Sequence, residues 1–162
     1  LEFQVNEHVL IPRQDTETLV ELVLSEHKEK NISLLDVCTG SGCIAISLAK
    51  LGGYTDVTAL DLSEEALKVA RSNGEKLLDQ PVKFIKSDMF SALNPEKQYN
   101  VIVSNPPYIP SQVIEGLEPE VKDHEPRMAL DGEPDGLKFY RILAEEGKKY
   151  LKNGGSIYME IG

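Results

Sequence analysis

The chain has 162 residues, and its 17 Lys and Arg against 27 Asp and Glu give a formal net charge of −10. This length suits a single domain, and 41% hydrophobic with 27% charged residues is ordinary for a globular protein and argues against a disordered chain. The excess of acid disfavours an extended phosphate-binding face, and no apolar run reaches the ~20 residues that a membrane helix requires. Neither nucleic acid nor a membrane is therefore expected as a partner.

The two cysteines, Cys38 and Cys43, stand in no C-x-x-C pattern, and no histidine lies near enough in sequence to complete a zinc site. The first residues lack the basic start and the apolar stretch of a signal peptide. We therefore expect reduced thiols, no bound metal and a cytoplasmic location.

Patterns typical of strands and of helices alternate along the chain. Residues 1–11 alternate weakly, which predicts an entry arm or hairpin within residues 1–15, ahead of one domain that spans residues 16–162. Residues 109–131 are rich in Pro, Gly and charge and predict a long loop. Strands are predicted at 32–37, 57–60, 82–86, 99–103 and 156–161. Helices are predicted at 16–30 with Asp15 as N-cap, at 42–51, at 63–78 with Ser63 as N-cap, and at 135–151. The last of these helices is expected to end before Asn153, Gly154 and Gly155 and to point four side chains inward, those of Leu137, Tyr140, Ile142 and Leu143.

Strands separated by helices predict an α/β fold with a doubly wound, mostly parallel sheet. In such folds the ligands bind at the carboxyl ends of the strands, so the chemistry is expected where the strands end. Because the sequence stops at Gly162, directly after a predicted strand, we expect that the sheet lacks a covering element and that the domain is incomplete.

A glycine-rich stretch follows the first predicted strand. Glycines let the backbone approach a ligand closely, and the start of the next helix offers free N–H groups. Asp61 ends the second predicted strand, where a carboxylate can accept both hydroxyls of a ribose, so the two features predict a nucleoside site. The glycine spacing leaves open a dinucleotide, whose pyrophosphate would sit on the helix start, and a sulfonium amino acid, whose ammonium Asp36 could meet. The stretch contains Asp36, Cys38, Thr39, Gly40, Ser41 and Gly42.

A second stretch, Asn105-Pro106-Pro107-Tyr108, follows the fourth predicted strand. The two prolines remove N–H donors and stiffen the turn, which leaves the Asn105 side-chain carbonyl and the Pro106 backbone carbonyl as acceptors. A planar NH₂ group offers two donors, so this pair can hold it by both hydrogens and direct its nitrogen to an electrophile. Tyr108 can stack on a flat amide or base.

These residues resemble the S-adenosylmethionine-dependent N-methyltransferases that act on planar NH₂ groups, and within them the HemK/PrmC family of protein-(glutamine) methyltransferases of peptide chain release factors. Asn-Pro-Pro-Tyr alone is shared with DNA adenine methylases, whereas the Ile-Pro-Arg segment ending at Arg13 and the Glu-Pro-Arg segment ending at Arg127 are far more specific. The similar segments are 9–17, 38–45, 87–90, 103–110, 125–130 and 135–137, and they extend over nearly the whole chain.

The resemblance implies a Rossmann-like methyltransferase core. The implied reaction transfers a methyl group from S-adenosylmethionine to the side-chain amide nitrogen of the glutamine in the Gly-Gly-Gln motif of release factors, leaves S-adenosylhomocysteine and requires no metal. The implied cofactor contacts are Asp36 and residues 38–42 at the methionine part, Asp61 at the ribose, Asp88 and Met89 at the adenine, and Asn105. The implied catalytic residues that hold the glutamine amide are Asn105, Pro106, Pro107 and Tyr108, and Arg13 and Arg127 would line the substrate site.

The sequence departs from the family in three respects. Gln14 stands where the family usually has Pro, and Met89 stands where an aromatic that stacks on the adenine is common. The family also carries an N-terminal helical domain and further strands after the fifth, so we expect a catalytic domain truncated at both ends. Three alternatives stay open: a nucleic-acid N-methyltransferase for the exocyclic amine of adenine or guanine, an NAD-dependent oxidoreductase, and a cofactor-binding fragment without activity.

Overall fold

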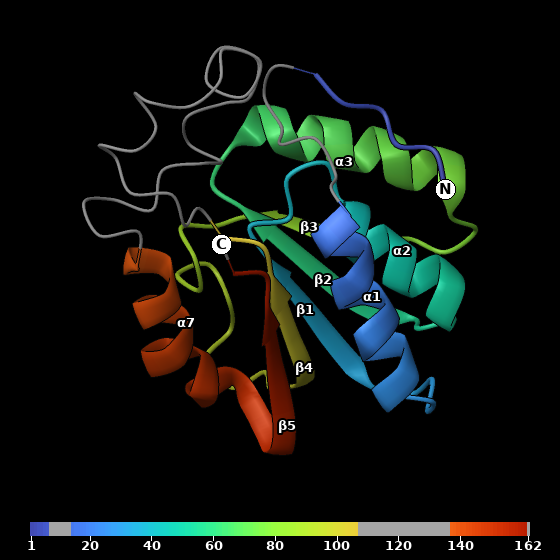
Figure 1. Ribbon diagram of the computed structural model, residues 1–162. Coiled ribbons are helices and arrows are strands. Elements are labelled where there is room, and N and C mark those ends of the chain that lie inside the picture. Colours follow the sequence, from blue (N-terminus) through green and yellow to red (C-terminus); the bar gives the residue numbers. More distant parts are fainter. Residues whose placement is uncertain (7–13, 107–136, 162) are drawn as a thin grey trace.

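The computed structural model describes residues 1–6, 14–106 and 137–161, which fold around one five-stranded sheet (Figure 1). Its strands are β1 (Ser33–Val37), β2 (Asp56–Asp61), β3 (Lys83–Lys86), β4 (Tyr99–Ser104) and β5 (Leu151–Met159). They lie in the order β3-β2-β1-β4-β5, and every neighbouring pair is parallel. The winding direction thus reverses between β1 and β4, where such sheets bind their ligands.

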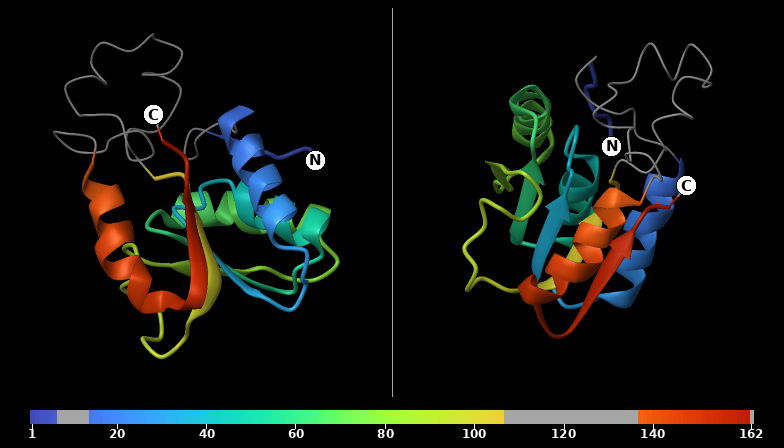
Figure 2. Two further views of the ribbon diagram at one scale, coloured as in Figure 1. Left: turned by 60° about the horizontal axis from the view of Figure 1, so that its bottom comes forward. Right: turned by 90° about the vertical axis from the view of Figure 1, so that its left-hand side faces the viewer.

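Helices cover both faces of the sheet, as the two views of Figure 2 show. On one face lie α1 (Gln14–Glu26), α2 (Cys43–Gly52) and α3 (Glu64–Leu77). On the other lie α7 (Lys138–Gly147) and the short 3₁₀-helix η1 (Lys148–Tyr150). This arrangement confirms the α/β fold with a doubly wound parallel sheet that the alternating pattern predicts.

The alternation of side chains along β1 divides the core into two clusters. Leu34 belongs to the cluster beneath α1 and α2, whereas Leu35 and Val37 belong to the cluster beneath α7. All five residues of β1 are buried, as expected of a central parallel strand. Asp36 follows the same alternation, so its carboxylate is carried into the interior beneath α2, where it is 1% exposed.

The start of α3 is formed as the sequence predicts, but the start of α1 is not. The Ser63 hydroxyl accepts the N–H of Ala66 at 3.1 Å, which satisfies one of the free donors at the helix start. The prediction that Asp15 caps the first helix is wrong, because α1 begins at Gln14 and includes Asp15 in its first turn. There the carboxylate faces the positive end of the helix dipole instead.

The predicted boundary between the last helix and the last strand is also wrong. The helix ends at Gly147, and β5 already begins at Leu151, so the Asn-Gly-Gly stretch lies inside the strand rather than stopping the helix. A register shift opposite Tyr99–Val101 accommodates it, with Gly154 at a φ of +82°. Gly155 permits a close approach of backbones, because a Cβ there would lie 2.9 Å from the Asn100 carbonyl oxygen. Leu137, predicted to face inward, is 47% exposed.

Several predictions fall outside the described residues. These include the hairpin as far as it involves residues 7–13, the loop at 109–131, and the positions of Arg13, Pro107, Tyr108 and Arg127. Within the described ranges, no helix is both long enough and apolar enough to cross a membrane.

Candidate active site

Because the strands are parallel, their carboxyl ends bring the predicted site residues to one edge of the sheet. Strand β1 leads into the glycine-rich loop, β2 ends at Asp61, β3 leads to Asp88 and Met89, and β4 leads to Asn105. Two hydrogen bonds join the carboxyl ends of β1, β4 and β5. The Ser104 hydroxyl donates to the Val37 carbonyl at 2.6 Å, and the Glu160 N–H donates to the Ser104 carbonyl at 3.0 Å. The residue after β5, Glu160, therefore lies at the same edge.

The loop between β1 and α2 is held in a tight turn by its own backbone. The Thr39 N–H donates to the Leu60 carbonyl at 2.8 Å, and the Gly42 N–H donates to the Thr39 carbonyl at 2.9 Å. Gly40 and Gly42 have φ angles of +56° and +84°, in the left-handed region that favours glycine. Apart from the two chain neighbours of Gly40, no atom of the described residues lies within 4 Å of where a Cβ on Gly40 would be, so the loop presents open space there.

Gly42 has a different requirement from Gly40. A Cβ on Gly42 would lie 2.9 Å from Ile46 Cδ1 and 3.1 Å from Ala70 Cβ, so a side chain would be strained and crowded at once. We expect Gly42→Ala to lower the free energy of unfolding by about 2–3 kcal/mol, measured by urea denaturation. An unchanged stability would show that the loop has another conformation in solution.

Asp61 connects the loop to the start of α3. Its two carboxylate oxygens accept the Gly40 N–H at 2.8 Å and the Ser63 N–H at 2.9 Å. Burial raises the pKa of this carboxyl, and the backbone donors oppose that rise. The sequence analysis predicts only a ribose as the partner of Asp61, whereas in the structure its carboxylate already accepts backbone donors and retains acceptor capacity for a further one.

Asp36 lies beneath the loop and is incompletely paired. One carboxylate oxygen, Oδ2, accepts the Thr39 hydroxyl at 2.7 Å and the Ala45 N–H at 3.2 Å. The other oxygen, Oδ1, is buried and has no hydrogen-bond partner among the described residues. Burial raises the pKa of Asp36 to about 7, and the two donors and the Asp61 charge change it further in opposite directions. The carboxylate is thus costly to ionise unless a donor reaches Oδ1.

Glu160 is a site residue that the sequence prediction missed. It is 5% exposed; Oε2 accepts the Thr16 hydroxyl at 2.7 Å, while Oε1 is buried and unpartnered among the described residues. Burial raises the pKa of the Cys43 thiol to about 12, and the charges of Asp36 and Glu160 contribute to this rise. In the sequence Glu160 is marked only by its position directly after the apolar residues Ile157, Tyr158 and Met159 of β5.

Asn105 completes a set of three acceptors. Its Oδ1 is buried and unpartnered in the described part of the chain, like Asp36 Oδ1 and Glu160 Oε1. Asp36 is the penultimate residue of β1, whereas Asn105 and Glu160 directly follow β4 and β5; these three strands are neighbours in the sheet. Buried polar atoms are almost always hydrogen-bonded, so three acceptors at one edge that have no partner among the described residues indicate a site for a ligand that brings N–H donors.

Strained backbone gathers at the same edge. Cys38 and Met89 are the non-glycine residues with positive φ in the described ranges, at +62° and +51°, and their sulfur atoms lie 3.7 Å apart. Such strain persists where the surrounding structure imposes it, often at binding sites. Burial raises the pKa of the Cys38 thiol, so the thiol stays neutral and presents an apolar surface at this edge of the sheet. Asp88, next to Met89, is exposed and could meet a ligand only from the solvent side.

Comparison with known proteins gives a consistent family. A family model described as methyltransferase small domain matches residues 14–116. The chain is 46% identical over 162 residues to the release factor glutamine methyltransferase of Streptococcus pneumoniae. This match covers 100% of this chain and 57% of that protein. The chain is also 47% identical over 161 residues to the release factor glutamine methyltransferase of Bacteroides thetaiotaomicron. This match covers 98% of this chain and 57% of that protein. The chain thus spans little more than half the length of these relatives.

A solved structure shows the same fold. The crystal structure of a methyltransferase from Pyrococcus furiosus matches with a TM-score of 0.69 at 22% identity, covering 98% of this chain and 68% of that chain. The chain is a member of the methyltransferase small domain family and a homologue of the release factor glutamine methyltransferases.

Proposed function

We propose that this chain binds S-adenosylmethionine at the carboxyl edge of β1 and β2 and methylates the side-chain amide nitrogen of the glutamine in the Gly-Gly-Gln motif of peptide chain release factors. The observation that carries the proposal is the set of three buried acceptors at this edge that find no partner in residues 1–6, 14–106 and 137–161. A cofactor ammonium and a substrate amide both bring N–H donors to such a set.

The residues fit the cofactor by their own chemistry. Asp36 Oδ1 offers an anionic acceptor beneath the loop for the ammonium, and the open space at Gly40 permits a close approach to the backbone. Asp61 retains acceptor capacity for the ribose hydroxyls, and the buried Met89 offers an apolar surface to the adenine. When bound, the cofactor supplies an electrophilic methyl group on a positively charged sulfur.

The substrate amide requires help, because its nitrogen lone pair is delocalised into its carbonyl. Asn105 Oδ1 and the Pro106 backbone carbonyl would accept the two amide hydrogens, weaken that delocalisation and fix the direction of the lone pair. Pro107 and Tyr108 would stiffen the turn and stack on the amide plane. Burial of the Asn105 acceptor away from water would strengthen these hydrogen bonds. The name of the similar relatives supports a release factor as the partner and glutamine as the accepting residue.

The proposal is tested in two steps on the full chain. Calorimetry should detect binding of S-adenosylhomocysteine and none of NAD. Mass spectrometry should then find one added methyl group on a release factor, none on its Gly-Gly-Ala variant and none on an adenine-containing oligonucleotide. Binding of NAD instead, or methylation of the oligonucleotide instead of the release factor, would overturn the proposal.

A matched pair of glycine substitutions isolates the role of the loop. Gly40 and Gly154 both have positive φ and open space around a Cβ, but they lie at opposite edges of the sheet. We expect Gly40→Ala and Gly154→Ala each to lower stability by about 1 kcal/mol, because both strain an L residue. Only Gly40→Ala should weaken S-adenosylhomocysteine binding, by about tenfold in calorimetry, which corresponds to ~1.4 kcal/mol. Equal affinities for the two variants would place the cofactor elsewhere.

A further inference from the structure

One polar residue on the buried face of α3 contacts the glycine-rich loop from behind. Asn73 is 1% exposed and follows Ala66 and Ala70 in the row of buried residues on this helix. Its Nδ2 donates to the Ser41 carbonyl at 2.9 Å. Ser41 belongs to the glycine-rich loop, so this hydrogen bond holds the loop from the side of α3.

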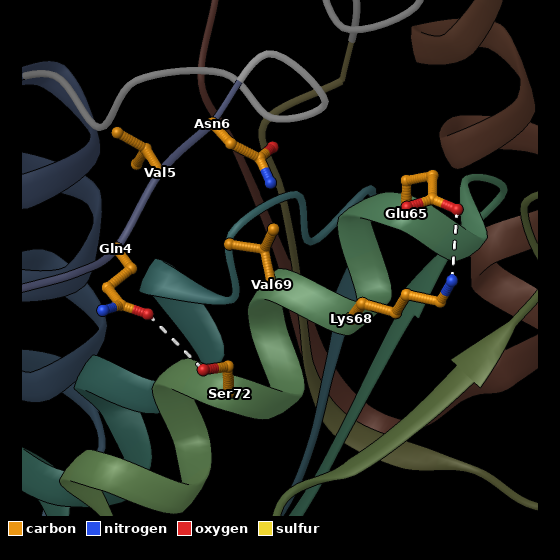
Figure 3. Close-up of a pocket in the computed structure, with 7 residues that line it drawn as sticks. All are labelled: Gln4, Val5, Asn6, Glu65, Lys68, Val69 and Ser72. Carbon is orange, nitrogen blue, oxygen red and sulfur yellow. Dashed lines mark hydrogen bonds and ion pairs between the residues drawn. The ribbon is translucent and has the colours of Figure 1, made fainter.

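The same side chain also binds the N-terminal segment, residues 1–6. The second hydrogen of Asn73 Nδ2 donates to the Gln4 carbonyl at 2.9 Å, and Asn73 Oδ1 accepts the Gln4 N–H at 2.7 Å. The segment runs along α3, and Figure 3 shows Gln4, Val5 and Asn6 facing Glu65, Lys68, Val69 and Ser72 across a groove. The Asn73 amide thus donates one hydrogen to the loop, and it uses its other hydrogen and its oxygen to bind the N-terminal segment.

We propose that Asn73 is a positioning residue that couples cofactor binding at the glycine-rich loop to docking of the N-terminal segment on α3. The inference rests on the proposed function, since the cofactor is the ligand of the loop. An amide whose two N–H groups hold two carbonyls fixes one partner better when the other is in place. Such coupling is reciprocal, so a ligand that orders the loop also tightens the segment.

The test substitutes both ends of the contact. Asn73→Asp is close in shape but turns an oxygen toward the Ser41 and Gln4 carbonyls, so both donated hydrogen bonds are lost. We expect S-adenosylhomocysteine to bind this variant about tenfold more weakly. Ligand-induced slowing of amide hydrogen exchange at Val5 and Asn6 should be present in the unmodified chain and absent in the variant.

A second pair of variants leaves every buried side chain unchanged. Gln4→Pro removes the N–H that Asn73 accepts, and it lies in an exposed segment without regular structure. We expect it to weaken ligand binding about threefold and to abolish the slowing at residues 5 and 6. Gln4→Ala retains both backbone hydrogen bonds and loses only a 3.5 Å side-chain contact to Ser72, so it should bind as the unmodified chain does.

The outcomes separate the two proposals. If the unmodified chain does not bind S-adenosylhomocysteine, the proposed function fails. If it binds, but Asn73→Asp and Gln4→Pro bind equally well and keep the slowed exchange, Asn73 is only a structural residue of α3 and the coupling is refuted.

Discussion

Replacing Asn105 by Ala is expected to reduce methyl transfer to a release factor by at least ~10³-fold while the affinity for S-adenosylhomocysteine changes less than about threefold. The reason is that Asn105 Oδ1 is a buried acceptor with no partner among the described residues, so it is free to hold a substrate hydrogen. The loop and Asp61 remain intact in this variant. Turnover with labelled S-adenosylmethionine and calorimetry with S-adenosylhomocysteine measure the two quantities separately.

Asn100, near the amino end of the same strand β4, provides the control. Asn100 Oδ1 accepts the Ser33 N–H at 2.9 Å, far from the carboxyl edge of the sheet. Asn100→Ala should therefore lower stability by about 1 kcal/mol and leave turnover per folded molecule unchanged. Asn105→Asp keeps an oxygen at the acceptor position and should lose less activity than Asn105→Ala. A parallel loss of cofactor affinity and turnover in Asn105→Ala would contradict the division of roles.

Most of the fold was predictable because local signals agree with the tertiary structure. Ser63 followed by two glutamates marks the start of α3, and the buried apolar strands reveal a parallel sheet. The end of α7 was not predictable from Asn153, Gly154 and Gly155. These residues usually stop helices, but here they serve a register shift and a close backbone approach within β5.

The residues of the candidate site also fall into those that a local sequence pattern indicates and those that only tertiary contacts reveal. Asp36, Gly40, Asp61 and Asn105 could be proposed as site residues from the sequence, because each lies at or shortly after the carboxyl end of a strand in a recognisable local pattern. Glu160 and Asn73 were not, because their significance arises from contacts with Thr16 and with Gln4 and Ser41, which lie far away in sequence. An Asn inside a helix or a Glu at a strand end is locally unremarkable, and only burial with its partners distinguishes it.

Asp36→Asn should make the protein more stable above pH 7 and at the same time impair cofactor binding. With a pKa of about 7, the folded Asp36 binds its proton more tightly than the unfolded group does, whose ordinary value is 3.8. The free energy of unfolding therefore falls as pH rises from about 4 to 7. At ~1.4 kcal/mol per pKa unit, the total cost is at most about 4 kcal/mol. Asn retains the oxygen that accepts Thr39 and Ala45 and removes the buried charge.

The same substitution places an N–H donor where Asp36 Oδ1 would face the ammonium. We expect S-adenosylhomocysteine to bind about 100-fold more weakly, because an ionic hydrogen bond is replaced by opposed donors. Urea denaturation between pH 5 and 8 should show a shallower pH dependence for the variant. Lower stability of Asp36→Asn at pH 8 would mean that the ionised carboxylate supports the fold, against the expected sign.

Asp56 provides the contrasting control on the neighbouring strand β2. Burial alone would raise the pKa of Asp56, but hydrogen bonds from Ser33 and Lys97 lower it below its ordinary value. Its charge therefore adds stability above the unfolded pKa, and that stability is lost as pH falls through the folded value. Asp56→Asn should lower stability at pH 8 by no more than about 1 kcal/mol and leave ligand affinity unchanged. Opposite stability changes in the two variants, with an affinity loss in Asp36→Asn alone, would show that Asp36 is kept for binding at the expense of the fold.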